Sequence, residues 1–174
     1  MVTYRRLPIL VTEEARNNLH WAWMDVKNRF PFTIEAICPL PDHIHCVWSL
    51  PDGDANYSVR WKEIKRLFSK RYMNSAGSNE FRSTSREKRA EVTVWQRRFW
   101  EHTLQDENDL QRHFDYIHYN PVKHGLVQQV KDWQWSSFHR FVRMGWDDMM
   151  RNGAAEMRGL TQLQVENKAK EMVR

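Results

Sequence analysis

The sequence predicts an α+β fold in which helices pack on one face of an antiparallel sheet. The predicted elements follow the order helix, strand, strand, helix, strand, helix, which is typical of such a sandwich. Apolar residues make up 41% of the 174 residues and aromatic residues 13%, enough to fill a core. We expect one domain over residues 1–150 and a polar C-terminal tail over residues 151–174, because a chain of this length fits a single core.

The first helix is predicted over residues 12–29. Thr12 is a suitable capping residue, Glu13 and Glu14 follow it in the first turn, and Pro31 prevents the helix from continuing. Apolar side chains recur at helical spacing along this segment, namely Leu19, Trp23, Val26 and Phe30.

A β-hairpin is predicted next. Thr33 to Cys38 and His43 to Leu50 are β-rich runs, and residues 39–42 between them contain two prolines and an aspartate. A second helix opens between Asp54 and Ser58 and carries apolar residues on one side and basic residues on another.

The second half of the chain begins with a segment that has no clear period. Residues 74–91 are poor in large apolar side chains, which predicts a mobile loop. Trp95 to Leu104 has a strand-like aromatic pattern, and residues 106–109 then cap a helix that is predicted to end near Pro121.

Basic residues gather between Ser58 and Arg98. This stretch holds twelve Lys and Arg against four Asp and Glu, a net charge of +8 in a chain whose total is +5. Such an excess beside aromatic residues suits a polyanion, above all single-stranded nucleic acid. The alternative is a solvated helix face followed by a charged loop, and composition alone does not decide between them.

The two cysteines and the apolar runs bear on the compartment. Cys38 and Cys46 lack metal-site or disulfide-framework spacing, so we interpret them as small core residues in a reducing compartment. No segment approaches the ~20 apolar residues of a membrane span. A cytoplasmic protein without membrane contact is expected.

A pair of histidines lies at the start of the second predicted strand. Side chains alternate between the faces of a strand, so His43 and His45 point the same way with Ile44 between them. Two neighbouring imidazoles can share one metal ion, although two histidines on a polar sheet face are equally consistent with the spacing.

The last predicted helix carries a second set of polar residues. Tyr116 and Asn120 are four residues apart and share a helix face, with His113 one turn earlier. This face offers a hydroxyl and an amide oxygen. Without the histidine pair, an amphipathic tyrosine and a helix-ending asparagine would be the preferred interpretation.

Together these residues resemble the HUH single-tyrosine transposases, named for a His-hydrophobic-His motif, and within them the REP-associated tyrosine transposases. The resemblance implies a ferredoxin-like sandwich, the HUH endonuclease fold. Five segments carry it in family order, namely residues 40–48, 60–65, 95–102, 115–125 and 132–139.

The resemblance also implies an activity. His43, His45 and Asn120 would bind a divalent metal, Mg²⁺ or Mn²⁺, and ligand preference favours Mn²⁺. Tyr116 would be the catalytic nucleophile, cleaving and rejoining single-stranded DNA at hairpins of repetitive extragenic palindromes through a 5′-phosphotyrosine. The expected phosphate contacts are basic residues: Arg60, Lys62, Lys65, Arg66, Arg97, Arg98 and Lys123. Trp95, Phe99 and Trp100 are interpreted as core residues in preference to base-stacking residues.

The sequence departs from this family at its start. Relatives carry a strand ahead of the first helix, beside the histidine strand, and this chain begins almost at that helix. A misassigned start, different pairing of residues 1–10, and a decayed copy all remain open, and an exposed sheet edge is one expected consequence. The loop over residues 74–91 is also longer than expected.

Three other functions share part of this pattern. A relative that binds hairpin DNA without catalysis is the main alternative. An RNA-binding α+β module is disfavoured, because His43 and His45 occupy the strand where such modules carry stacking aromatics. A rolling-circle nickase normally belongs to a larger protein. A monomer is expected.

Overall fold

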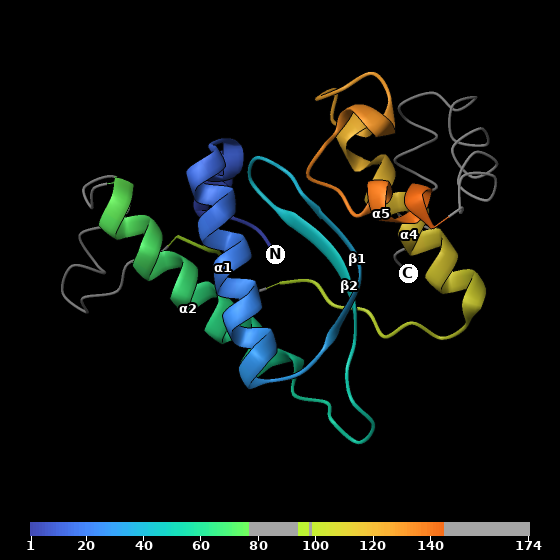
Figure 1. Cartoon of the computed structure of the whole chain (residues 1–174), viewed down its shortest axis with the longest axis horizontal. Helices are drawn as coiled ribbons and strands as arrows, with labels where there is room; N and C mark the ends of the chain where they lie inside the picture. Colours follow the sequence, from blue (N-terminus) through green and yellow to red (C-terminus); the bar gives the residue numbers. More distant parts are fainter. Residues whose placement is uncertain (77–93, 98, 145–174) are drawn as a thin grey trace. The chain divides into compact units, whose positions relative to one another are not determined.

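The structure, a computed structural model, describes residues 1–76, 94–97 and 99–144 (Figure 1). Its main elements are α1 (Glu13–Arg29), β1 (Thr33–Pro39), β2 (Ile44–Ser49), α2 (Tyr57–Ala76), α4 (Glu107–Lys123) and α5 (Phe138–Arg143), with short 3₁₀ turns at Tyr4–Arg6, Ile9–Val11 and Val130–Asp132. The chain divides into two compact units, and each unit includes part of the hairpin. The first unit comprises Met1–Thr33, Leu40–Ile44 and Trp48–Phe99, and the second comprises Ile34–Pro39, His45–Val47 and Trp100–Arg174. The single domain over residues 1–150 stays a prediction.

Helix α1 confirms the predicted first helix. The Thr12 side chain accepts a hydrogen bond from the Ala15 backbone N–H at 3.2 Å, which caps the helix, and Glu13 and Glu14 occupy its first turn. The helix ends at Arg29, two residues before Pro31. Its buried residues are Ala15, Asn18, Leu19, Ala22, Trp23 and Val26.

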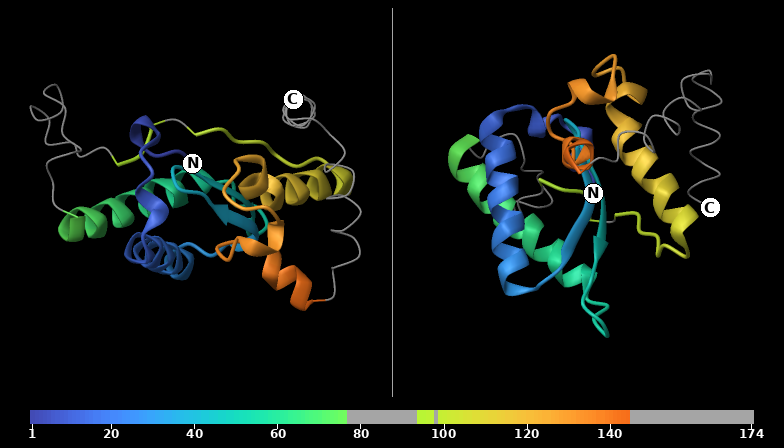
Figure 2. Two further views of the ribbon diagram at one scale, coloured as in Figure 1. Left: turned by 90° about the horizontal axis from the view of Figure 1, so that it is seen from above. Right: turned by 45° about the vertical axis from the view of Figure 1, so that its right-hand side comes forward.

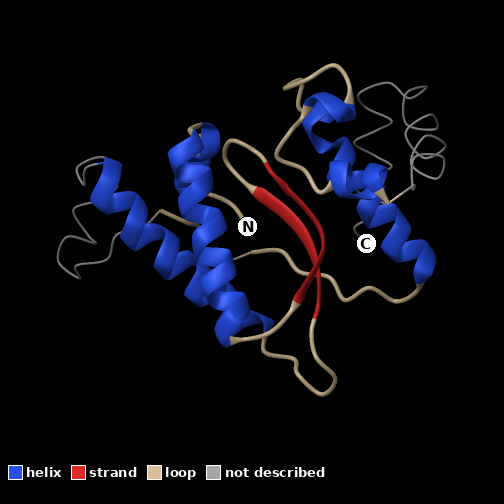
Figure 3. Cartoon of the chain, viewed as in Figure 1, coloured by secondary structure: helices blue, strands red, loops and turns tan. Residues whose placement is uncertain are grey.

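The predicted hairpin is also present. β1 and β2 form a two-stranded sheet, drawn in red in Figure 3. Its turn is closed by a hydrogen bond of 2.7 Å from the Leu40 N–H to the His43 carbonyl. Because β2 starts at Ile44, His45 is the second residue of the strand, and His43 lies directly before it in a bridge with Val2.

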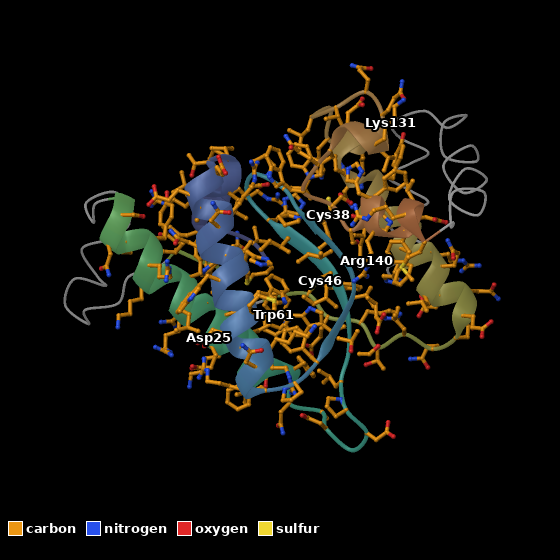
Figure 4. The ribbon with its side chains drawn as sticks, viewed as in Figure 1. Asp25, Cys38, Cys46, Trp61, Lys131 and Arg140 are labelled. Carbon is orange, nitrogen blue, oxygen red and sulfur yellow. The ribbon has the colours of Figure 1, made fainter. Side chains whose placement is uncertain are left out.

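An aromatic cluster forms the core of the first unit. Trp48 of β2 stacks on Trp61 of α2 with ring centroids 4.4 Å apart, and Trp23 of α1 meets both rings edge-on. Helices α1 and α2 lie side by side in both views of Figure 2, and Trp61 is labelled at their junction with the strand in Figure 4. These contacts hold both helices against β2, which confirms the predicted α+β class.

The first four residues pair beside the histidine strand. Val2 forms an antiparallel bridge with His43, Thr3 forms one with Trp95, and the Ile44 N–H donates to the Met1 carbonyl at 2.7 Å. Thus a short N-terminal segment pairs with the strand start, in agreement with the possibility that residues 1–10 pair differently. Within the described chain, this pairing extends along β2 only as far as Ile44.

Helix α4 extends further than predicted. It includes Pro121 and ends at Lys123, and Gly125 follows with φ +66°. Pro121 lies in the last turn, so its missing N–H removes one bond near the end of the helix. The left-handed Gly125 then donates its N–H to the Val122 carbonyl and terminates the helix. At the other end, the Asp106 side chain accepts the Asp109 N–H at 2.8 Å, which confirms the predicted cap.

The predicted strand from Trp95 to Leu104 is wrong in the described residues. Only Trp95 pairs, in its single bridge with Thr3, and residues 99–105 form neither helix nor strand. The aromatic pattern therefore reflected side-chain packing rather than strand pairing. Most of the expected loop over residues 74–91, and the whole tail over 151–174, lie outside the described residues. No helix in the described part of the chain is long and apolar enough to cross a membrane.

Candidate active site on helix α4

Tyr116 lies in the second unit, against the histidine strand. Its ring meets the His45 ring edge-on, with centroids 5.4 Å apart and an interplanar angle of 83°. Both side chains are half-buried. The structure therefore brings together a predicted nucleophile and a predicted metal ligand that are 71 positions apart in the sequence.

Asn120 is fully buried one helical turn beyond Tyr116. Its side-chain N–H donates to the Tyr116 backbone carbonyl at 2.8 Å, which fixes the orientation of the amide. Its Oδ1 atom is buried and has no hydrogen-bond partner. An unsatisfied buried oxygen costs free energy, so it is a suitable ligand for a cation. The amide oxygen of Asn120 therefore fits the divalent metal that the family resemblance implies.

Lys123 approaches Tyr116 from the end of the same helix. Its Nζ atom lies 5.1 Å from the centroid of the Tyr116 ring, a cation–π distance. Lys123 is half-buried, and it places a positive charge beside the tyrosine.

His43 belongs to the first unit. It is 6% exposed, and its Nδ1 atom lies 2.6 Å from Oδ1 of Asp42. Burial by itself would raise the pKa of the Asp42 carboxyl, but the hydrogen bonds and positive charges of His43 and Arg6 outweigh it and hold that pKa below its usual value. An ionised carboxylate on one ring nitrogen is the usual way in which a metal-binding histidine is oriented.

Arg60 departs from its predicted role. It is 2% exposed, and its guanidinium donates to both carboxylate oxygens of Asp54, at 3.2 and 2.6 Å, and to the carbonyls of Phe30, Pro31 and Asn56. A guanidinium with its donors so committed has none to offer a phosphate. The assignment of Arg60 to DNA is therefore corrected: it ties the start of α2 to the end of α1.

The other basic residues divide into two groups. Lys62 and Arg97 are exposed, and so is Arg66, which is paired with Glu63 at 2.8 Å. Lys65 is half-buried, donates to the Gln96 carbonyl at 2.8 Å, and has its pKa lowered by burial. Arg98 lies outside the described residues.

The aromatic residues near position 100 also differ among themselves. Trp95 is 5% exposed and contacts Phe68, and Phe99 packs on Tyr57 and Trp61, so the core interpretation holds for both. Trp100 is 57% exposed, and the core interpretation is wrong for it.

A cluster that the sequence did not predict lies near the start of α4. His102 and His113 both contact the Asp109 carboxylate, at 2.7 and 3.1 Å, and the three ligand atoms lie within 4.8 Å of one another, a spacing compatible with a divalent metal. The two imidazole rings are nearly parallel, however, with centroids 5.0 Å apart. Nitrogen lone pairs lie in the ring plane, so one ring would have to turn before both bound a single ion. The sequence did contain one signal for this cluster: Asp109 and His113 are four residues apart, which places them on the same face of a helix.

Residues 1–120 match the family described as IS200-like transposases. The chain is 42% identical over 141 residues to the REP-associated tyrosine transposase of Escherichia coli (strain K12), which covers 81% of this chain and 74% of that protein. It is 46% identical over 127 residues to a protein of Haemophilus influenzae provisionally given the same name, which covers 73% of this chain and 70% of that protein.

A solved structure is similar as well. It is described as a REP-associated tyrosine transposase bound to a REP hairpin. It matches with a TM-score of 0.66 at 40% sequence identity, and the match covers 83% of this chain and 77% of that one.

Proposed function

We propose, from the premise that the chain belongs to the IS200-like transposase family, that this transposase cleaves and rejoins single-stranded DNA at REP hairpins through a covalent bond to Tyr116. The observation that carries the proposal is the arrangement on α4, where the Tyr116 ring contacts His45 and a buried, unpartnered amide oxygen of Asn120 follows one turn later. The hairpin is proposed as substrate because the similar solved structure is bound to one.

Three residues would hold a divalent metal ion. Members of this family generally use such an ion, and His43, His45 and Asn120 offer two imidazoles and an amide oxygen, a set that Mn²⁺ accepts more readily than Mg²⁺. When bound, the ion supplies Lewis-acid polarisation of a phosphate oxygen. Asp42 supports the set by hydrogen bonding His43, and the Tyr116 backbone supports it by orienting Asn120.

Tyr116 performs the covalent step. Its hydroxyl oxygen attacks the phosphorus, a new bond joins that oxygen to the 5′ phosphate, and the bond from phosphorus to the 3′ oxygen breaks. The tyrosine gives up one proton, and the departing 3′ oxygen takes up one and leaves as a hydroxyl. Because one phosphate ester replaces another, attack by a different 3′ hydroxyl reverses the step and joins a new strand without ATP.

The basic residues are proposed to bind the DNA backbone. Lys123 lies against the Tyr116 ring, where its charge can attract the phosphate that is to be cleaved. Exposed Lys62, Arg66 and Arg97, with Lys65 and Arg98, are proposed as further phosphate contacts. Binding should therefore weaken steeply with salt. We propose that the monomer is the active form.

The test is formation of a covalent protein–DNA adduct. Purified protein, a labelled single-stranded hairpin and Mn²⁺ should give a band that survives denaturing electrophoresis, and Tyr116→Phe and His45→Ala should both abolish it. Tyr119→Phe is the matched control, because Tyr119 is a half-buried tyrosine on the same helix, and this variant should keep the band. Hairpin binding without any adduct would instead identify a DNA-binding protein without catalysis.

A further inference from the structure

Ser137 satisfies both backbone groups of a residue in β1. The Ile37 N–H donates to the Ser137 hydroxyl oxygen at 2.9 Å, and the Ser137 N–H donates to the Ile37 carbonyl at 2.9 Å. Together these bonds replace one rung of a β ladder, so the edge of β1 is paired at this point although no strand lies there among the described residues.

Flanking contacts extend this attachment along β1. The Trp133 indole N–H donates to the Pro39 carbonyl at 3.1 Å, and the Arg140 guanidinium donates to the carbonyls of Ile34 and Glu35. Arg140 and Cys38 are both labelled in Figure 4, and Cys38 belongs to the same strand. These hydrogen bonds lie on both sides of Ser137, so they fix residues 133–140 to nearly the full length of β1.

The Ser137 hydroxyl also reaches helix α4. Its oxygen lies 2.7 Å from Nε2 of His118, which is 1% exposed and packs against Phe138 and Phe141. His118 lies two residues after Tyr116 and two before Asn120. One hydroxyl therefore hydrogen bonds to both β1, the neighbour of the histidine strand, and the helix that carries the tyrosine.

We infer that Ser137 is a positioning residue, which through His118 and Ile37 holds α4 against the β1–β2 hairpin so that Tyr116 stays aligned with His45. This inference rests on the proposed function, since alignment matters only if Tyr116 attacks a phosphate. A displacement of about 1 Å at a reacting group costs on the order of 100-fold in rate, whereas contacts to the DNA backbone elsewhere tolerate it. Loss of the hydroxyl should therefore slow the covalent step and leave hairpin binding intact.

The experiment separates the two steps. For Ser137→Ala, the single-turnover rate of adduct formation with Mn²⁺ should fall about 10- to 100-fold, and the hairpin Kd should stay within about twofold of the original. Ser137→Thr keeps the hydroxyl and should restore most of the rate. Ser136→Ala is the matched control. The Ser136 hydroxyl accepts the Phe138 N–H at 3.1 Å and also contacts Cys38 of β1, but among the described residues these contacts do not reach α4, so the rate should not change.

A second variant tests the link from the helix side. His118→Phe keeps a ring among Phe138 and Phe141 but removes the hydrogen bond, and it should slow the adduct as Ser137→Ala does. Because both variants remove the same hydrogen bond, between Ser137 and His118, the double variant should form the adduct no more slowly than either single variant. This variant also keeps the inference testable if Ser137→Ala fails to fold, and circular dichroism at the assay temperature establishes that each variant is folded.

Three outcomes would overturn the inference. The first is an unchanged adduct rate in folded Ser137→Ala, which refutes positioning while the proposed function stands. The second is a parallel loss of rate and hairpin affinity, which indicates a general structural role. The third is the absence of any Tyr116-dependent adduct in the unmodified protein, which removes the proposed function and this inference together.

Discussion

Acidification should destabilise the protein through His118. This imidazole is 1% exposed, and burial, reinforced by the positive charges of Arg140 and His139, lowers its pKa from 6.5 to about 4. The folded state therefore favours neutral His118, while the unfolded state binds a proton as soon as the pH falls below 6.5. The stability from this residue is fully present above pH 6.5 and is lost as the pH falls toward 4.

The size of this loss of stability follows from the lowering of the His118 pKa. One bound proton contributes about 1.4 kcal/mol per pH unit, so the full window is worth roughly 3 kcal/mol of unfolding free energy. Urea unfolding of the metal-free protein, followed by circular dichroism across this pH range, gives the free energy at each pH. Subtracting the curve of His118→Phe isolates the residue from carboxyls such as Asp42 and Asp109, whose pKa values are lowered. An identical pH slope in the two proteins would refute the argument.

Three further substitutions test separate parts of the structure. Arg60→Ala should lower the unfolding free energy by roughly 2 kcal/mol, because it removes a buried guanidinium that donates to three carbonyls and to the Asp54 carboxylate, and urea unfolding measures the change. Lys62→Ala should leave stability unchanged but reduce hairpin affinity and lower the slope of log affinity against log salt by about 1; an unchanged slope would remove Lys62 from the interface. Asp42→Ala should weaken Mn²⁺ binding about 10- to 100-fold in calorimetry, and equal affinity would show that His43 needs no support from it.

Local signals made much of the fold predictable. The boundaries of α1 and the start of α4 follow from capping side chains, Thr12 and Asp106, that act within three residues of themselves. The hairpin follows from two β-rich runs around a short proline-containing turn. These signals are short-range, so one sequence contains them. The pairing of His45 with Tyr116 was expected from the family resemblance, and the described structure agrees with it.

The failures have a common physical origin in long-range contacts. Arg60 was assigned to DNA because it stands among basic residues, but carbonyls from around positions 30 and 31 determine its burial. The aromatic run from Trp95 to Leu104 suggested a strand, although Trp95 is the one described residue of that run that forms a β-bridge, with Thr3. Ser137 lies in a segment that carries the family resemblance, but its role was not predicted, since its partners His118 and Ile37 lie 19 and 100 residues away. Contacts between residues so far apart in the sequence depend on the tertiary fold, and local sequence spacing does not reveal them.

The central claim is that Tyr116 becomes covalently bound to DNA. The most direct measurement is mass spectrometry of the protein after reaction with a hairpin oligonucleotide and Mn²⁺, followed by protease and nuclease digestion. We expect one modified peptide, containing Tyr116 with a 5′-linked nucleotide on its side chain, and no modification of the neighbouring Tyr119. A nucleotide on any other residue, or a bound hairpin with no modified peptide, would contradict it.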